Sequence, residues 1–270
     1  ETGKFSPTNS GKLSPTVTTG ANLFLASYSL LLFVALPYPS SRSALVVKLV
    51  AALERLLVSY GPRGWWPLPS LAGTPGRDAN GYALGPSLPV GPGGGAIDRS
   101  LRFEIAVGAV LAQNTAWSGA ERAVAAVAEA GALSPSPMLA LPAGELEDLI
   151  KPAGTFRIKA GYLRGLASAW TELDEGVPTR GELLALPGIG FETADCVLLY
   201  AYGEPTFVAD AYARRLLSRL GHAIDGRSYE GARRYAEDLL PLEAPYLAEA
   251  HALIVEHCKL RCRARPLCDG

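Results

Sequence analysis

The chain has almost no net charge and few cysteines. It contains 25 Lys and Arg residues against 26 Asp and Glu among its 270 residues, a formal net charge of −1. The whole chain therefore lacks the basic excess that marks many nucleic-acid-binding proteins, and any such surface must be local. The four cysteines are too few, and too clustered towards one end, for the disulfide scaffold of a small secreted protein. We expect a reducing compartment.

Long apolar runs and an initiating methionine are also missing. The most apolar stretch, residues 21–36, is shorter than the about 20 residues that a membrane-spanning helix needs. No basic cluster precedes it and no small-residue cleavage signature follows it, so a secretory signal is a poor interpretation. The only methionine is Met138. We interpret residues 1–44 as a disordered or spurious N-terminal extension and expect no contact with a membrane.

Sustained period-2 alternation, the pattern of β-strands, is absent as well. Apolar residues recur at i, i+3, i+4 and i+7 over residues 45–59, which predicts a helix. From Leu101 to the end of the sequence, stretches of helical periodicity alternate with short Gly/Pro punctuation. Residues 67–100 are rich in glycine and proline and predict a loop insertion. The sequence therefore predicts an all-α fold.

The stretch LPGIG, residues 186–190, predicts a tight hairpin between two helices. A capping-box spacing at 179–182 starts the first helix, and the second should start near Phe191. Two glycines allow a close approach of another backbone, while Ile189 should point into the core. The free amide groups at the start of the second helix suit a phosphate, so the hairpin can grip a DNA backbone without reading its sequence. The simpler alternative is an ordinary helix–helix corner.

Asp210 lies between an apolar segment, residues 207–209, and an amphipathic helix. Aspartate is a favoured N-cap, and capping alone accounts for the residue. The same position favours the ionised carboxylate. A carboxylate among apolar neighbours can also stabilise a sugar oxocarbenium ion and position the attacking water. The residues alone therefore leave Asp210 as either a helix cap or a catalytic candidate.

Residues 186–215 resemble the helix-hairpin-helix superfamily of DNA base-excision glycosylases, whose signature is this hairpin followed by one catalytic aspartate. Residues 60–67, 103–117, 151–163 and 251–259 resemble the endonuclease III-related branch in the same order. The resemblance implies a two-lobed helical fold, in which 101–205 forms one lobe and 45–66 packs with 206–270 in the other. DNA is then expected across the cleft, with Asp210 at its floor.

The resemblance also bears on the reaction. Bifunctional members carry a lysine in the helix after the hairpin, which forms a Schiff base and nicks the strand. Phe191 and Glu192 stand at that place here, and no lysine occurs between Lys159 and Lys259. The expected reaction is therefore hydrolysis of the N-glycosidic bond, which leaves an abasic site.

Trp65 and Trp66 are the candidates for holding the base. An enzyme that acts on a base in duplex DNA flips it into a pocket, where aromatic faces can stack on it. A positively charged alkylated purine would gain a cation–π attraction of about 0.5–2 kcal/mol on such faces. The Trp-Trp pair resembles the pocket of enzymes that remove 3-methyladenine; alternatively, one or both tryptophans belong to the core.

Several further residues are predicted to contact DNA. Gln113 and Asn114 match the loop that fills the gap left by the flipped base in relatives, or form a polar helix end. Arg214 and Arg215 are candidate backbone contacts or plain surface charges. The predicted DNA-binding residues are Gln113, Asn114, Leu186, Pro187, Gly188, Ile189, Gly190 and Thr193.

The cysteines raise the question of a cofactor. Relatives with a 4Fe-4S iron–sulfur cluster use four cysteines near the C-terminus. Cys262 and Cys268 match the first two, whereas Cys196 and Cys258 are unconvincing substitutes. Two ligands do not hold such a cluster. We expect either a truncated sequence, which we favour, or a member without the cluster.

The sequence thus predicts a monofunctional DNA glycosylase that excises alkylated, 3-methyladenine-like purines in base excision repair. The alternatives are a bifunctional glycosylase/lyase on oxidised or mismatched pyrimidines and a non-enzymatic DNA-binding protein. We expect double-stranded DNA with a damaged base as the partner, a monomer, and a cytoplasmic, nucleoid-associated location.

Overall fold

The structure is a computed structural model that describes residues 41–87, 98–224 and 227–267. Helices joined by loops make up these ranges, which contain no strand; one isolated β-bridge joins Arg77 to Ala83. In the described part of the chain, no helix is both long and apolar enough to cross a membrane. The predicted all-α fold is confirmed.

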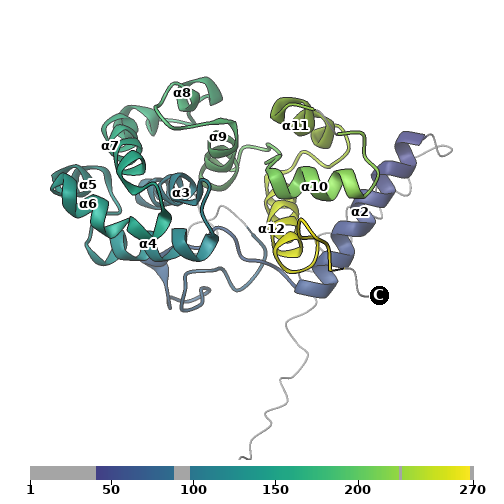
Figure 1. Cartoon of the computed structure of the whole chain (residues 1–270), viewed down its shortest axis with the longest axis horizontal. Coiled ribbons are helices and arrows are strands. Elements are labelled where there is room, and N and C mark those ends of the chain that lie inside the picture. The colour runs from purple at the N-terminus through teal and green to yellow at the C-terminus, as the bar shows by residue number, and fades with distance from the viewer. Residues whose placement is uncertain (1–40, 88–97, 225–226, 268–270) are drawn as a thin grey trace, which may run out of the picture.

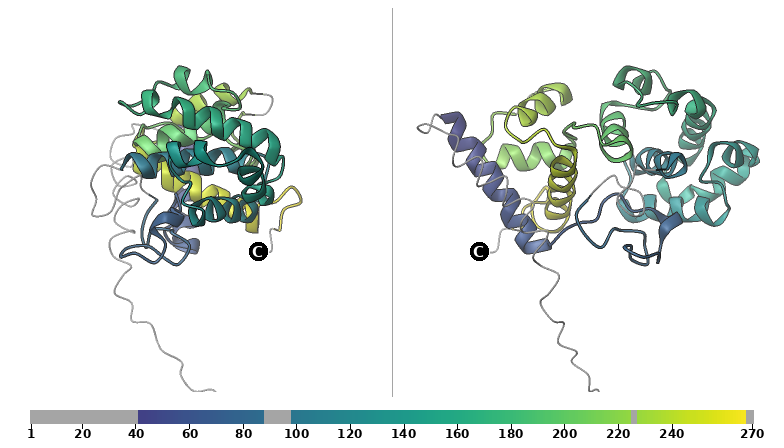
Figure 2. Two further views of the ribbon diagram at one scale, coloured as in Figure 1. Left: turned by 90° about the vertical axis from the view of Figure 1, so that its left-hand side faces the viewer. Right: turned by 180° about the vertical axis from the view of Figure 1, so that it is seen from behind.

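The helices form two groups, which lie apart in Figure 1 and in the reverse view of Figure 2. One group contains α3 (Arg99–Ala112), α4 (Trp117–Glu129), α5 (Pro135–Ala140), α6 (Ala143–Leu149), α7 (Phe156–Leu173), α8 (Arg180–Leu184) and α9 (Phe191–Val197). The other contains α2 (Ser41–Tyr60), α10 (Ala211–Arg219), α11 (Tyr229–Glu237) and α12 (Ala244–Leu260). The short turns are η1 (Pro69–Leu71), η3 (Lys151–Ala153) and the π-helical η4 (Leu198–Tyr202), which continues α9.

Helix α3 is the centre of the first group. Every residue from Phe103 to Leu111 is buried, because α4, α7 and α9 pack around it. Such an all-round apolar helix belongs in an interior. Gly108 leaves room for an indole ring, since a Cβ there would lie 2.8 Å from Trp66 Nε1. Helix α3 thus provides, at Gly108, the space in which the Trp66 ring packs.

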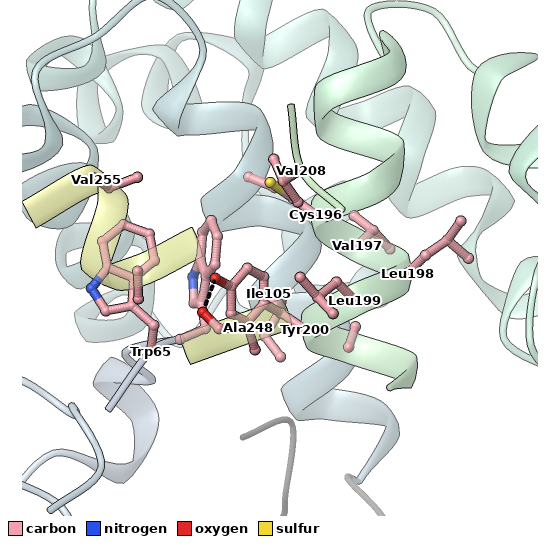
Figure 3. Close-up of a cluster of buried hydrophobic side chains, with 14 of the residues drawn as sticks. Trp65, Ile105, Cys196, Val197, Leu198, Leu199, Tyr200, Val208, Ala248 and Val255 are labelled. Atoms are coloured by element: carbon pink, nitrogen blue, oxygen red, sulfur yellow. Dashed lines mark hydrogen bonds between the residues drawn. The ribbon is translucent and has the colours of Figure 1, made fainter. Parts of the chain in front are cut away.

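Helix α12 is the centre of the second group and is buried from Tyr246 to Val255 between α2 and α10. It also packs against η4, where the Tyr200 hydroxyl donates to the Ala248 carbonyl at 3.1 Å (Figure 3). This contact joins the two groups. The two-lobed arrangement is the one expected from the sequence.

The hairpin between α8 and α9 forms as predicted. The capping box joins Thr179 to Glu182, Ile189 is buried, and α9 begins at Phe191. Gly188 has φ 82, and a Cβ there would collide with the Tyr162 ring. Glycine is therefore required at 188 for both backbone and packing reasons.

The N-terminal part differs from the expected boundaries. Helix α2 begins at Ser41, so the last residues of the predicted 1–44 extension are helical, while 1–40 lie outside the described residues. Within the predicted loop insertion 67–100, the described part packs against the core: Leu68 is buried and its amide donates to the Gly81 carbonyl at 3.0 Å. Residues 88–97 lie outside the description.

Candidate active site

A cavity of about 110 Å³ lies between the two groups of helices, and residues far apart in the sequence line it. Asp210 shares it with both predicted tryptophans. The lining residues are Trp65, Trp66, Ala112, Thr115, Trp117, Glu192, Cys196, Asp210, Tyr212, His251, Val255 and Lys259. Trp65, Cys196 and Val255 come together from three different segments in Figure 3.

Asp210 is the N-cap of α10 and is buried. Its Oδ1 accepts a hydrogen bond from the Ala213 amide at 2.6 Å. Its Oδ2 lies 3.7 Å from His251 Nε2, which is longer than a hydrogen bond. One carboxylate oxygen therefore caps the helix, and the other has no direct protein hydrogen bond among the described residues. The predicted capping role is confirmed.

His251 is oriented by Tyr200. The Tyr200 hydroxyl lies 2.7 Å from His251 Nδ1, and the hydroxyl is itself fully buried at the contact between η4 and α12. Because the Tyr200 hydroxyl has one proton and donates it to the Ala248 carbonyl, its oxygen accepts a hydrogen bond from His251 Nδ1. His251 was not singled out from the sequence, because its place beside Asp210 depends on the packing of α12 against α10.

Three tryptophans form the aromatic wall of the cavity. The ring centroids of Trp65 and Trp117 are 4.6 Å apart, and those of Trp66 and Trp117 are 5.4 Å apart. Trp65 and Trp66 are buried, while Trp117 is half-buried and donates from Nε1 to the Tyr82 hydroxyl at 2.6 Å. The two predicted tryptophans thus belong both to the core and to the cavity. Trp117, the third, was not predicted as part of the site.

Two charged residues complete the lining. Glu192, at the start of α9, lines the cavity although it is exposed; crowding by protein atoms, and secondarily the charge of Asp210, raise the pKa of its carboxyl. Lys259, near the end of α12, is half-buried, and desolvation lowers the pKa of its ammonium group. The absence of lysine between Lys159 and Lys259 therefore does not leave the cavity without an amine.

Lys259 could have been found from helical spacing. His251, Val255 and Lys259 follow one another at intervals of four residues, and all three line the cavity. Residues at i, i+4 and i+8 share one face of a helix. The sequence therefore predicts that these three residues share one face of a helix, but it does not show which residues that face contacts.

Of the two predicted gap-filling residues, Gln113 supports the hairpin. The Gln113 side-chain amide donates to the Gly188 carbonyl at 2.8 Å and to the Thr193 hydroxyl at 2.9 Å. Thr193 is buried, so its side chain ties α9 to the end of α3. Asn114 is exposed, in the left-handed region at φ 49. Of the residues around this loop, Asn114 has the side chain that is free to reach a bound duplex.

Arginines on α10 line a separate groove of about 390 Å³, together with Arg227. Arg215 donates from Nε to the Cys262 carbonyl at 2.8 Å, and Arg219 donates to the Arg263 carbonyl at 2.7 Å. Both therefore hold the segment that follows α12. Arg214 also lines the groove.

The structure describes one of the two predicted cluster ligands. Cys262 is buried, and its Sγ lies 3.1 Å from Arg219 Nη1; Cys268 lies outside the described residues. A 4Fe-4S cluster needs four thiolates. Among the residues that the structure describes, no group of three or more His, Cys, Asp or Glu side chains is placed to hold a metal. These residues do not fit a cluster on their own.

The two-lobed all-α fold, the glycine hairpin and the aspartate in an aromatic cavity define a class of DNA-processing proteins, and comparison with known proteins agrees. The model of the HhH-GPD superfamily base excision DNA repair protein matches residues 107–242. A Methanocaldococcus jannaschii protein named "Putative DNA repair glycosylase" is 34% identical over 226 residues, covering 80% of this chain and 89% of that protein. Endonuclease III of Sulfolobus acidocaldarius is 30% identical over 180 residues, covering 62% of this chain and 77% of its own.

Solved structures agree in fold. The 3-methyladenine DNA glycosylase MagIII of H. pylori, bound to 1,N6-ethenoadenine, superposes with a TM-score of 0.55 at 21% identity, over 82% of this chain and 98% of that one. The chain belongs to the HhH-GPD superfamily and is a DNA glycosylase of base excision repair. The alternative of a non-enzymatic DNA-binding protein is therefore wrong.

Proposed function

We propose that the protein is a monofunctional DNA N-glycosylase in which Asp210 supports hydrolysis of the bond between the sugar and a damaged base. The observation that carries this proposal is the buried Asp210 carboxylate in a cavity walled by tryptophans, with Glu192 rather than lysine at the start of α9. A carboxylate cannot form a Schiff base, so Glu192 cannot supply the lyase step.

The carboxylate of Asp210 has an oxygen available for the reaction. Oδ1 is occupied by the Ala213 amide, whereas Oδ2 can face a sugar or a water. When the bond from C1′ to the base nitrogen breaks, its electron pair stays on the base and C1′ becomes cationic. Asp210 stabilises that cation, water adds to C1′, and the proton of the water passes to the carboxylate and then to solvent.

The hairpin is the proposed contact with the DNA backbone. The backbone at Gly190 is open, because a Cβ built there meets no atom within 4 Å. A phosphate can therefore approach the amides at the start of α9, which continues into η4. Leu186 to Gly190 present this turn, and Arg214 adds a positive charge on the neighbouring α10. Asn114 is the proposed gap-filling side chain.

The alkylated purine expected from the sequence stays a prediction. The aromatic wall suits a flipped base of any kind, because every base offers a π face. Lys259, however, already holds a positive charge over two of the three indole rings. A cationic base would meet like charge there, so the cation–π argument for alkylated bases loses force.

A second candidate function follows from the same lysine. An amine with a lowered pKa in an active-site cavity can attack the aldehyde of an abasic site, as lyases do. The bifunctional alternative thus has Lys259 as its specific candidate nucleophile.

Strand scission distinguishes the monofunctional glycosylase from the bifunctional glycosylase/lyase. Duplexes containing a single uracil, thymine glycol or 3-methyladenine are incubated with the protein and analysed before and after hot alkali. Breaks that appear only after alkali support the monofunctional reaction. Breaks without alkali, together with borohydride trapping of a covalent adduct, would refute it in favour of the lyase. Excision by Asp210→Asn at the wild-type rate would refute the role of Asp210.

A further inference from the structure

Lys259 places a positive charge inside the proposed active site. Its Nζ lies 5.8 Å from the ring centroid of Trp65 and 5.9 Å from that of Trp117. The side chain shares the cavity with Asp210 and is fixed by α12, the buried central helix of its group. A half-buried ammonium group over two aromatic rings has lost part of its hydration shell, and cation–π attraction to the rings replaces part of that interaction.

The ammonium group is not neutralised by a direct partner. Among the residues that the structure describes, no carboxylate lies within ion-pair distance of Lys259 Nζ. Glu256, one turn earlier on α12, pairs instead with Arg63 at 3.3 Å. Lys259 is therefore available to interact with a group that enters the cavity.

The charge of the departing base differs between two classes of substrate. When the glycosidic bond of a neutral base breaks, the electron pair of that bond leaves the base as an anion, delocalised onto its ring nitrogens and carbonyl oxygens. When the base already carries a positive charge, as 7-methylguanine does in DNA, the same electron pair leaves it neutral. Only the first class develops a negative charge that a fixed cation stabilises in the transition state.

We propose that Lys259 stabilises the negative charge on a departing neutral base, so that the preferred substrates are neutral, carbonyl-bearing bases such as uracil or hypoxanthine rather than cationic alkylated purines. This inference rests on the proposed function, because it needs Asp210 to support the cationic sugar while Lys259 supports the anionic base. In this arrangement, the charges of Asp210 and Lys259 match the two charges that bond breaking creates.

The test compares single-turnover excision from duplexes that contain uracil, hypoxanthine or 7-methylguanine at one position, with alkali cleavage as the readout. Lys259→Met keeps much of the apolar stem but removes the charge, Lys259→Arg keeps the charge, and Lys48→Met makes the same change on the exposed face of α2. We expect Lys259→Met to lower uracil and hypoxanthine excision about 100-fold, and to leave 7-methylguanine excision unchanged or raise it. Lys259→Arg should recover most of the loss, and Lys48→Met should match the wild type.

Several results would overturn the inference. Excision of 7-methylguanine but of neither neutral base by the wild type would refute it. An equal fall in the excision rate of all three substrates in Lys259→Met would also refute it, because such a fall indicates a structural role of Lys259. A borohydride-trapped adduct that disappears in Lys259→Met would assign Lys259 as a nucleophile instead. Asp210→Asn is measured in parallel: its full activity would refute the proposed function, whereas a substrate-independent effect of Lys259→Met, with Asp210→Asn inactive, would refute this inference alone.

Discussion

Replacing Asp210 by asparagine separates catalysis from helix capping. Asparagine is as good an N-cap as aspartate, so its side-chain oxygen can still accept from the Ala213 amide, which now lies 2.6 Å from Oδ1. The change removes the negative charge and little else. We expect the fold to persist, with a melting temperature within about 4 °C of the wild type.

The rate should fall much more. A unit positive charge about 4 Å from the carboxylate, at an effective dielectric constant of about 20, is stabilised by about 4 kcal/mol. Each 1.4 kcal/mol in an activation barrier is about a tenfold change in rate, so the loss of this charge should slow excision about 1000-fold. Single-turnover excision and a thermal melt on the same preparation measure the two effects.

Asp210→Ala provides the matched comparison. It loses both the charge and the cap, which costs about 1 kcal/mol of stability, yet its excision rate should be close to that of Asp210→Asn. If Asp210→Asn excised bases at the wild-type rate while Asp210→Ala was merely less stable, Asp210 would be a cap only and the catalytic assignment would be refuted.

Three further predictions concern the hairpin, a buried lysine and the start of α9. Gly188→Ala should destabilise the protein by about 1–2 kcal/mol through its left-handed backbone alone, with a further cost from displacing Tyr162. Gly190→Ala should cost less, because a Cβ there has open space and the change affects only the N-cap residue of α9. Burial lowers the pKa of Lys159 from 10.5 to about 8, so the unfolded chain binds more protons between these values; the stability of the wild type relative to Lys159→Met should therefore rise from about pH 8 to about pH 10, as urea titrations at the two pH values would show. Glu192→Lys puts an amine beside Asp210 and should produce a borohydride-trapped adduct with abasic DNA; no adduct above that of the wild type would contradict the proposal that Glu192, in the place of a lysine, excludes lyase chemistry.

Local signals accounted for the parts of the site that lie close together in the sequence. The capping box at Thr179 and Glu182, the buried Ile189 and the start of α9 at Phe191 each follow from spacing within a few residues. The N-cap position of Asp210 is equally local. Helix ends and turns depend on backbone groups whose partners are near in the chain, and this is why they were predictable.

The residues of the cavity that the sequence did not predict depend on tertiary packing. Trp117 and Lys259 are separated by about half of the chain, yet both line the cavity that Asp210 shares. Periodicity shows which residues share a helix face, but not which face of another helix they meet. Gln113 illustrates the same limit: the resemblance to the gap-filling loop of relatives suggested a contact with DNA, whereas the fold directs its amide into the hairpin. Long-range contacts of this kind bring the charged side chains of the cavity together.

The structural and catalytic explanations of Asp210 support one another. A carboxylate inside an aromatic cavity loses hydration, which is unfavourable unless other groups compensate. The Ala213 amide donates to one oxygen, and the N-terminus of α10 contributes a positive potential at the same point. Capping therefore compensates part of the lost hydration at one oxygen, and leaves the second oxygen for the proposed hydrolysis. A residue that could cap but not carry charge would keep the helix and lose the reaction, which is the difference that Asp210→Asn measures.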